Sequence, residues 1–177
     1  MKLRARKYEG AAAPHEFAEF AQGLICLVRD PERLAWAVET FGPRNVYAEL
    51  QRHLDRRQEA RNQALVERAR RLRIPLLATN GVAYARPAER EILDVLTCVR
   101  EKVRLDSAGR LLQKNGECYL KPAAEMERLF ADLPEAIANT RELSQRLDFT
   151  LAGLGYEFPR YPVPPGETMN SFLRQRT

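Results

Sequence analysis

Glu49, Gln51 and His53 are the residues whose types and spacing are best suited to chemistry. They occupy every second position at the end of an otherwise apolar segment, 45–53. Because side chains alternate along an extended strand, all three lie on one face. Glu49 and His53 are of the types that bind divalent metals, and active sites assemble at the carboxyl ends of parallel strands. Two ligands do not make a hydrolytic centre, so the spacing alone favours a polar strand end in which His53 bonds to a neighbour.

A second group of polar residues ends the next apolar segment, 74–79. Thr79 and Asn80 are neutral and are weak ligands for a hard cation. The dipeptide Asn80-Gly81 is typical of a turn with positive φ. The pattern therefore favours a turn, and not a set of further metal ligands that would complete a site with Glu49 and His53.

Between these two segments lies a basic helix. Its arginines could follow a phosphate backbone, or they could form the solvated outer face of a helix that covers a sheet. The net charge of +5 and the pI near 9.3 permit a polyanion partner without requiring one. Glu59 and Glu67 interleave with the arginines and favour the solvated outer face; the arginines are Arg57, Arg61, Arg68, Arg70, Arg71 and Arg73.

The elements that must position these residues alternate between strand and helix. Strands are predicted at 24–28, 45–50 and 74–79, and helices at 31–41, 59–72 and about 90–103, the last with a strong apolar stripe. Such an order predicts an α/β fold with parallel strands and crossover helices. Two further helices open at Pro122 and Pro134. Residues 155–166 contain four prolines and predict an extended Pro-rich connector, followed by helical turns from Thr168.

Composition sets limits on the class of protein. At 177 residues and 45% hydrophobic content the chain can form a globular core. There is no apolar run of roughly 20 residues and no apolar region after the basic start, which predicts a cytoplasmic protein without a membrane partner. Cys26, Cys98 and Cys118 are widely spaced and only two histidines are present, so a disulfide framework or a structural zinc site is not expected.

Taken in order, six segments resemble the bacterial replicative DNA polymerase III alpha family, and most closely its error-prone, damage-inducible branch. The resemblance extends from about Phe20 to Thr177 and implies the later part of a PHP (polymerase and histidinol phosphatase) domain, a distorted β/α barrel. By this resemblance residues 1–19 are a poorly defined N-terminal segment, 20–150 are the back half of the barrel, and 151–177 are the Pro-rich connector and the truncated start of the polymerase palm. The segments are 45–53, 75–80, 94–100, 125–130, 134–140 and 154–159.

The resemblance also implies what the site has lost. Glu49 and His53 match metal-ligand positions of the family, but Gly81-Val82-Ala83 stands where metal-binding members have Asp-x-His, and the early His-x-His motif is absent. We therefore expect a vestigial metal site, no catalytic residues and no cofactor in this chain. Mg²⁺ is implied for the intact polymerase alone.

The function implied is that of a fragment of an error-prone DNA-directed DNA polymerase, active in replication and translesion repair, with this chain as a structural portion. DNA, the remaining polymerase domains and other damage-response replication proteins are the implied partners. Two alternatives stay open: an active metal-dependent phosphoesterase or 3′–5′ exonuclease, and a non-enzymatic scaffold or DNA-binding remnant. Because half a barrel leaves strand edges and apolar surface uncovered, we also expect the isolated chain to self-associate.

Overall fold

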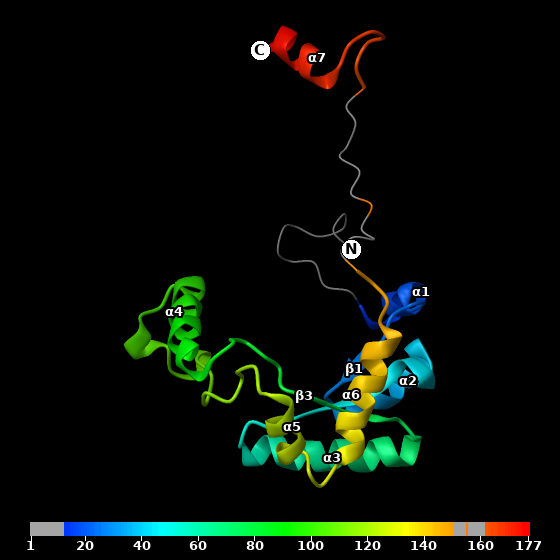
Figure 1. Ribbon diagram of the computed structural model, residues 1–177, viewed down its shortest axis with the longest axis vertical. Coiled ribbons are helices and arrows are strands. Elements are labelled where there is room, and N and C mark those ends of the chain that lie inside the picture. The colour runs from blue at the N-terminus through cyan, green and yellow to red at the C-terminus, as the bar shows by residue number, and fades with distance from the viewer. Residues whose placement is uncertain (1–12, 151–154, 156–161) are drawn as a thin grey trace. The chain divides into compact units, whose positions relative to one another are not determined.

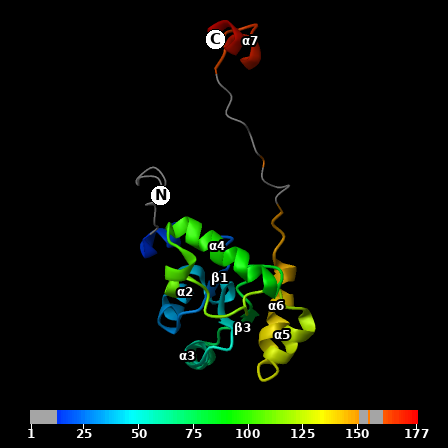
Figure 2. The same cartoon turned by 90° about the vertical axis from the view of Figure 1, so that its left-hand side faces the viewer.

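The computed structural model describes residues 13–150, 155 and 162–177 (Figures 1 and 2). The chain divides into two units, residues 1–145 and residues 146–177. The first unit contains the sheet and every residue singled out above for chemistry. The described elements of this unit are α1 (Phe17–Phe20), β1 (Cys26–Val28), α2 (Leu34–Phe41), β2 (Val46–Gln51), α3 (Arg56–Leu72), β3 (Leu76–Thr79), α4 (Arg90–Glu101), α5 (Ala123–Leu129) and α6 (Pro134–Arg146), of which α6 ends at the unit boundary.

The sheet has three parallel strands in the order β1-β2-β3. Leu27 pairs with Tyr47 between the first two strands, and Glu49 pairs with Leu77 between the second and third. Helices α2 and α3 make the two crossovers. The predicted α/β class with parallel strands and crossover helices is confirmed.

One face of the sheet packs against α2 and α3, and its residues alternate as the sequence predicts. Val46, Ala48 and Leu50 of β2 are fully buried against apolar residues of both helices. The opposite face carries Tyr47 and Leu77, which pack with Leu143 of α6. Glu49 and Gln51 lie on that second face, nearer the strand end.

Local signals explain where the crossover helices begin. Asp30 accepts a hydrogen bond from the backbone N–H of Glu32 at 3.1 Å and precedes Pro31, which starts a 3-10 turn leading into α2. Asp55 caps α3 by accepting from the N–H of Arg57 at 2.9 Å. Helix α3 therefore begins at Arg56, three residues before the predicted start.

Helices α5 and α6 are joined to the sheet by polar contacts. Arg52 donates to the carbonyl of Leu129 at 2.7 Å and to Asp132 at 2.9 Å. Asn139 and Thr140 of α6 donate to the carbonyls of Leu76 and Ala78, at 2.8 and 3.0 Å. The expectation of uncovered strand edges is only partly met at β3, because two of its carbonyl groups accept hydrogen bonds from side chains of α6.

Helix α4 packs in the opposite sense to the one its stripe suggests. Its apolar residues are exposed, with Ile92 at 60%, Val95 at 52%, Leu96 at 59% and Val99 at 70% of their full surface. The side turned toward the protein carries Cys98, which is buried, and the partly buried Arg90–Asp94 pair. Figure 1 shows α4 standing apart from α2, α3 and α6.

The second unit contains helix α7 (Met169–Arg176). Thr168 caps it by accepting from the N–H of Ser171 at 3.0 Å, so the predicted helical turns are present. The predicted Pro-rich connector lies largely outside the described residues. In the described part of the chain, no helix is long and apolar enough to cross a membrane.

Candidate functional site

The first part of the candidate site is a polar cluster at the ends of β2 and β3. Thr79 donates to Glu49 Oε1 at 2.6 Å, and the Gln51 amide donates to the same oxygen at 2.8 Å. Arg29, which follows β1, donates to Gln51 Oε1 at 3.2 Å and lies 4.0 Å from Glu49 Oε2. The Glu49 carboxylate is thus held by a cation and two hydrogen bonds from the protein itself.

Gly81 makes room for this cluster. Its φ of +51° is strained for residues with a side chain. A Cβ atom added there would lie 2.8 Å from Gln51 Oε1, inside any normal contact distance. The expected positive φ is confirmed at Gly81 but not at Asn80, and residues 80–83 are not assigned as a turn.

His53 is held by a separate set of bonds whose donors and acceptors can be assigned. Gln58 Oε1 accepts from the backbone N–H of His53 at 2.7 Å, which assigns the oxygen and the nitrogen of the Gln58 side-chain amide. The NH₂ group of that amide lies 3.1 Å from His53 Nδ1, which must therefore accept. His53 Nε2 then carries the proton and donates to the carbonyl of Asn80 at 2.8 Å. Both ring nitrogens are occupied, and neither offers a free lone pair to a metal.

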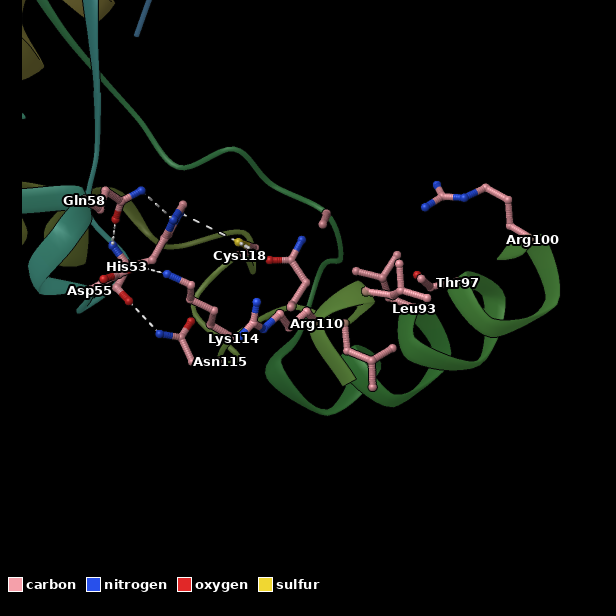
Figure 3. Close-up of a pocket in the computed structure, with 14 residues that line it drawn as sticks. His53, Asp55, Gln58, Leu93, Thr97, Arg100, Arg110, Lys114, Asn115 and Cys118 are labelled. Carbon is pink, nitrogen blue, oxygen red and sulfur yellow. Dashed lines mark hydrogen bonds and ion pairs between the residues drawn. The ribbon is translucent and has the colours of Figure 1, made fainter. Parts of the chain in front are cut away.

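Figure 3 shows the cavity beside His53, which measures about 520 Å³. Cys118 lies there with its Sγ 3.8 Å from His53 Nε2, and the thiol donates to Gln113 Oε1 at 3.4 Å. Burial raises the pKa of the Cys118 thiol. Because Nε2 already carries a proton, His53 cannot take one from Cys118 in this arrangement, and the pair is not arranged as a nucleophile and base.

Asp55 and Lys114 form an ion pair on the rim of the same cavity. The hydrogen bond from Lys114 lowers the pKa of Asp55. Asn115 donates to the carbonyl of His53 at 2.6 Å and ties the segment before Cys118 to the end of β2. This wall of the cavity is therefore fixed to the strand end.

The structure places Glu49 and His53 in two different clusters. A cavity of about 460 Å³ lies beside Glu49, and Gln58 lines both this cavity and the one beside His53. Across residues 13–150, 155 and 162–177, no three His, Cys, Asp or Glu side chains gather as a metal site requires. The donor set seen here does not fit a divalent metal, because the two matching residues already have protein partners.

The basic helix is α3, and it covers the sheet. Leu65, Val66 and Ala69 form its buried side, while most of its arginines are exposed. Arg61 lines the cavity beside Glu49, and Arg70 lies 3.9 Å from Glu135 of α6. The helix therefore has the outer position that the sequence favours.

Sequence reasoning missed Gln58, Asn115 and Cys118 as contacts of His53. Gln58 is five residues from His53 and lies in the first turn of α3. Its contact with the residues before the helix could therefore have been predicted from the sequence as a helix-capping interaction. Asn115 and Cys118 come from a segment without periodicity, more than 60 residues along the chain. Only the tertiary structure brings them to the strand end.

Fold and site together define an α/β protein with a parallel sheet and hydrogen-bonded polar clusters at its strand ends. No family model matches the chain. An error-prone DNA polymerase of Bradyrhizobium sp. (strain ORS 278) is 43% identical over 166 residues, covering 93% of this chain and 13% of that protein. One from Rhodopseudomonas palustris (strain BisB5) is 39% identical over 187 residues, covering 99% and 17%.

A third such polymerase, from Rhodopseudomonas palustris (strain ATCC BAA-98 / CGA009), is 53% identical over 105 residues. The chain belongs to the error-prone DNA polymerase family. It spans 13% and 17% of the length of the two relatives that match most of its own residues.

Proposed function

We propose that this chain is a structural, PHP-type portion of an error-prone DNA-directed DNA polymerase, which acts in replication and translesion repair in the bacterial cytoplasm. The proposal assigns residues 20–150 to the back half of the β/α barrel and 151–177 to the connector and the start of the palm, with 1–19 as an N-terminal segment. Its support is the family membership together with the parallel sheet. DNA and the remaining polymerase domains are the proposed partners, with Mg²⁺ bound in the palm.

One observation favours a structural role over a nuclease role. Both nitrogens of His53 and the carboxylate of Glu49 are engaged by protein groups, and a Cβ atom added at Gly81 would clash with the side chain of Gln51. A ligand side chain at position 81 would meet Gln51. On this reading Glu49 and His53 are a vestigial metal pair that now holds the strand ends in place.

The metal part of the proposal is tested with the whole chain. We expect Mn²⁺ titration by calorimetry to give no saturable binding, and 3′-labelled DNA to release no nucleotides with Mn²⁺ or Mg²⁺. Contaminating nuclease is identified by His53→Ala, which would leave such activity unchanged. Metal-dependent nucleotide release that His53→Ala abolishes would overturn the structural role in favour of an active phosphoesterase or exonuclease.

The polymerase part is tested by the size of the native gene product. Immunoblots of cells with and without DNA damage, using an antibody against residues 13–150, should show a large band that damage induces. A band near 20 kDa in both conditions would contradict the proposal. It would favour a free-standing scaffold or DNA-binding remnant.

The DNA-binding alternative is favoured by exposed arginines along α3. Arg57, Arg61 and Arg71 are all exposed on that helix. Fluorescence anisotropy with a labelled duplex at low salt decides this point, because phosphate contacts weaken steeply as salt rises. Salt-dependent binding that Arg57→Gln and Arg61→Gln reduce would support the alternative, and no binding at low salt would dismiss it.

A further inference from the structure

The apolar face of α4, formed by Ile92, Val95, Leu96 and Val99, is the most unusual surface of the first unit. Each of these side chains is more than half exposed. They recur at intervals of three and four residues and so form one continuous stripe along the helix. The main contacts of α4 are with the short turns that flank it, Pro87–Glu89 and Leu105–Ser107.

Such a stripe is normally the side that a helix buries. Here the opposite side holds the buried Cys98 and the Arg90–Asp94 ion pair at 3.5 Å, whose two members both belong to the helix. Arg90 also donates to the carbonyl of Gln113 at 2.9 Å. Leu105 and Leu111, which follow the helix, are also exposed. A contiguous exposed patch of this kind marks an interaction surface.

Charges at the two ends of α4 indicate what can cover it. Residues 89–94 at the N-terminal end carry three acidic side chains against one basic one, and residues 100–104 at the C-terminal end carry three basic side chains against one acidic one. The pairs Arg90–Asp94 and Arg100–Glu101 form within the chain, which leaves Glu91 near one end and Lys102 at the other. A second α4 running antiparallel brings the acidic end of each helix to the basic end of the other. A parallel arrangement would bring like charges together.

We propose that two copies of this chain associate through the apolar face of α4, in an antiparallel pair related by a two-fold axis. The axis passes between Val95 and Leu96, so that Ile92 of each copy meets Val99 of the other. This self-association does not depend on the proposed polymerase function. Although α4 lies within the segment 20–150 assigned to the barrel, the proposed function places no site residue on this face.

Helical geometry places one charge pair beside this contact on each side of the axis. At 100° per residue, the backbone positions of Glu91 and of Lys102, the first residue past the end of α4, flank the apolar face on the same side. A two-fold axis perpendicular to the helices then places Glu91 of one copy next to Lys102 of the other. Lys102 has φ of +55° at the end of α4, and the side chain of Glu91 is exposed. The pair occurs twice by symmetry.

Interface size sets the expected strength. Helix α4 has twelve residues and is therefore about 18 Å long. A contact of this length with the neighbouring leucines falls at the small end of specific interfaces. We expect a dissociation constant on the order of 10 μM, with a monomer at nanomolar concentration.

Sedimentation velocity over a concentration series of the full chain tests the apolar contact. The wild type should show a monomer–dimer equilibrium, and Val95→Asp should weaken it by at least about tenfold, because it places two charges at the centre of the interface. Leu54→Asp is the matched control, since Leu54 is 78% exposed and lies outside α4. It should leave the equilibrium unchanged.

Charge reversal tests the antiparallel arrangement. Glu91→Lys and Lys102→Glu should each weaken the dimer by about three- to tenfold, since each places like charges together. The double variant should restore wild-type association. Circular dichroism confirms that each variant keeps its helix content.

Two outcomes overturn the proposal. A wild-type chain that stays monomeric to high micromolar concentration would leave the α4 face to a different polypeptide. Association that rises without limit, or that the double charge reversal does not restore, would show unspecific apolar contact in place of a two-fold pair.

Discussion

Helices α3 and α4 have similar amphipathic patterns, but the apolar side is buried in α3 and exposed in α4. The apolar residues of α3 are buried against the sheet, with Leu65 only 1% exposed, whereas Val99 of α4 is 70% exposed. Helix α3 connects β2 to β3 along the chain, and these two strands pair with each other. The crossover therefore holds the apolar side of α3 against the sheet. After α4, the described residues form only an isolated bridge, Tyr84 to Tyr119, and no strand draws the helix onto the sheet. An apolar stripe predicts a helix. Whether the chain itself covers that stripe depends on whether the segment after the helix forms a strand that joins the sheet.

The largest expected effect is a difference in the free energy of unfolding between substitutions in α3 and in α4. Leu65→Ala should lower the free energy of unfolding by about 2–5 kcal/mol, because it leaves a cavity in the core. Leu96→Ala, made on the exposed face of α4, should change it by no more than about 0.5 kcal/mol. Urea denaturation at low protein concentration measures both. Equal losses would show that α4 is packed within the monomer.

A smaller effect is expected in the loop that leads from β3 toward α4. Gly81→Ala should cost about 1–3 kcal/mol, since alanine is strained at positive φ and its Cβ meets Gln51. Combining it with Gln51→Ala should recover the steric part of that loss and leave the conformational part. A double-mutant cycle by thermal or urea unfolding measures the coupling. Simple additivity of the two substitutions would contradict the contact.

The next prediction concerns the ion pair that fastens α5 and α6 to the strand side of the molecule. The Arg52 hydrogen bond lowers the pKa of Asp132 below its ordinary value of 3.8. A lowered folded-state pKa means that the stabilisation is present above about pH 4 and is lost as the pH falls through the folded-state value. Asp132→Asn should cost about 0.5–1 kcal/mol at pH 7, reduced by solvent screening, and less at pH 3. A cost that does not depend on pH would contradict this assignment.

The smallest effect lies in the segment between α4 and α5. The Tyr119 hydroxyl donates a hydrogen bond to the Glu125 carboxylate, which raises the pKa of Tyr119 to about 12. Because the folded-state pKa is raised, this stabilisation is present below pH 10 and is lost as the pH rises through 10 toward 12. Glu125→Gln should bring the pKa of Tyr119 down toward the ordinary tyrosine value of 10.0. Absorbance titration of the tyrosines would show an unchanged transition if the contact does not form.

The sequence predicts the sheet better than it predicts its surroundings. The parallel pairing and the buried positions of β2 follow from local periodicity, because the alternation of strand and helix leaves few topologies. The position of Glu49 on the second face was also predictable. The separation of Glu49 from His53 was not, because it depends on Arg29, Asn115 and Cys118, which come from distant segments. The exposure of α4 depends likewise on what lies beside it in space.

Hydrogen exchange followed by mass spectrometry, on the full chain at two concentrations, tests the contrast between the two helices most directly. Amides of α3 should be protected equally at nanomolar and at high micromolar concentration, since their burial is internal. Amides of α4 should exchange quickly at the low concentration and gain protection at the high one. Protection of α4 equal to that of α3 at the lowest concentration would contradict the account.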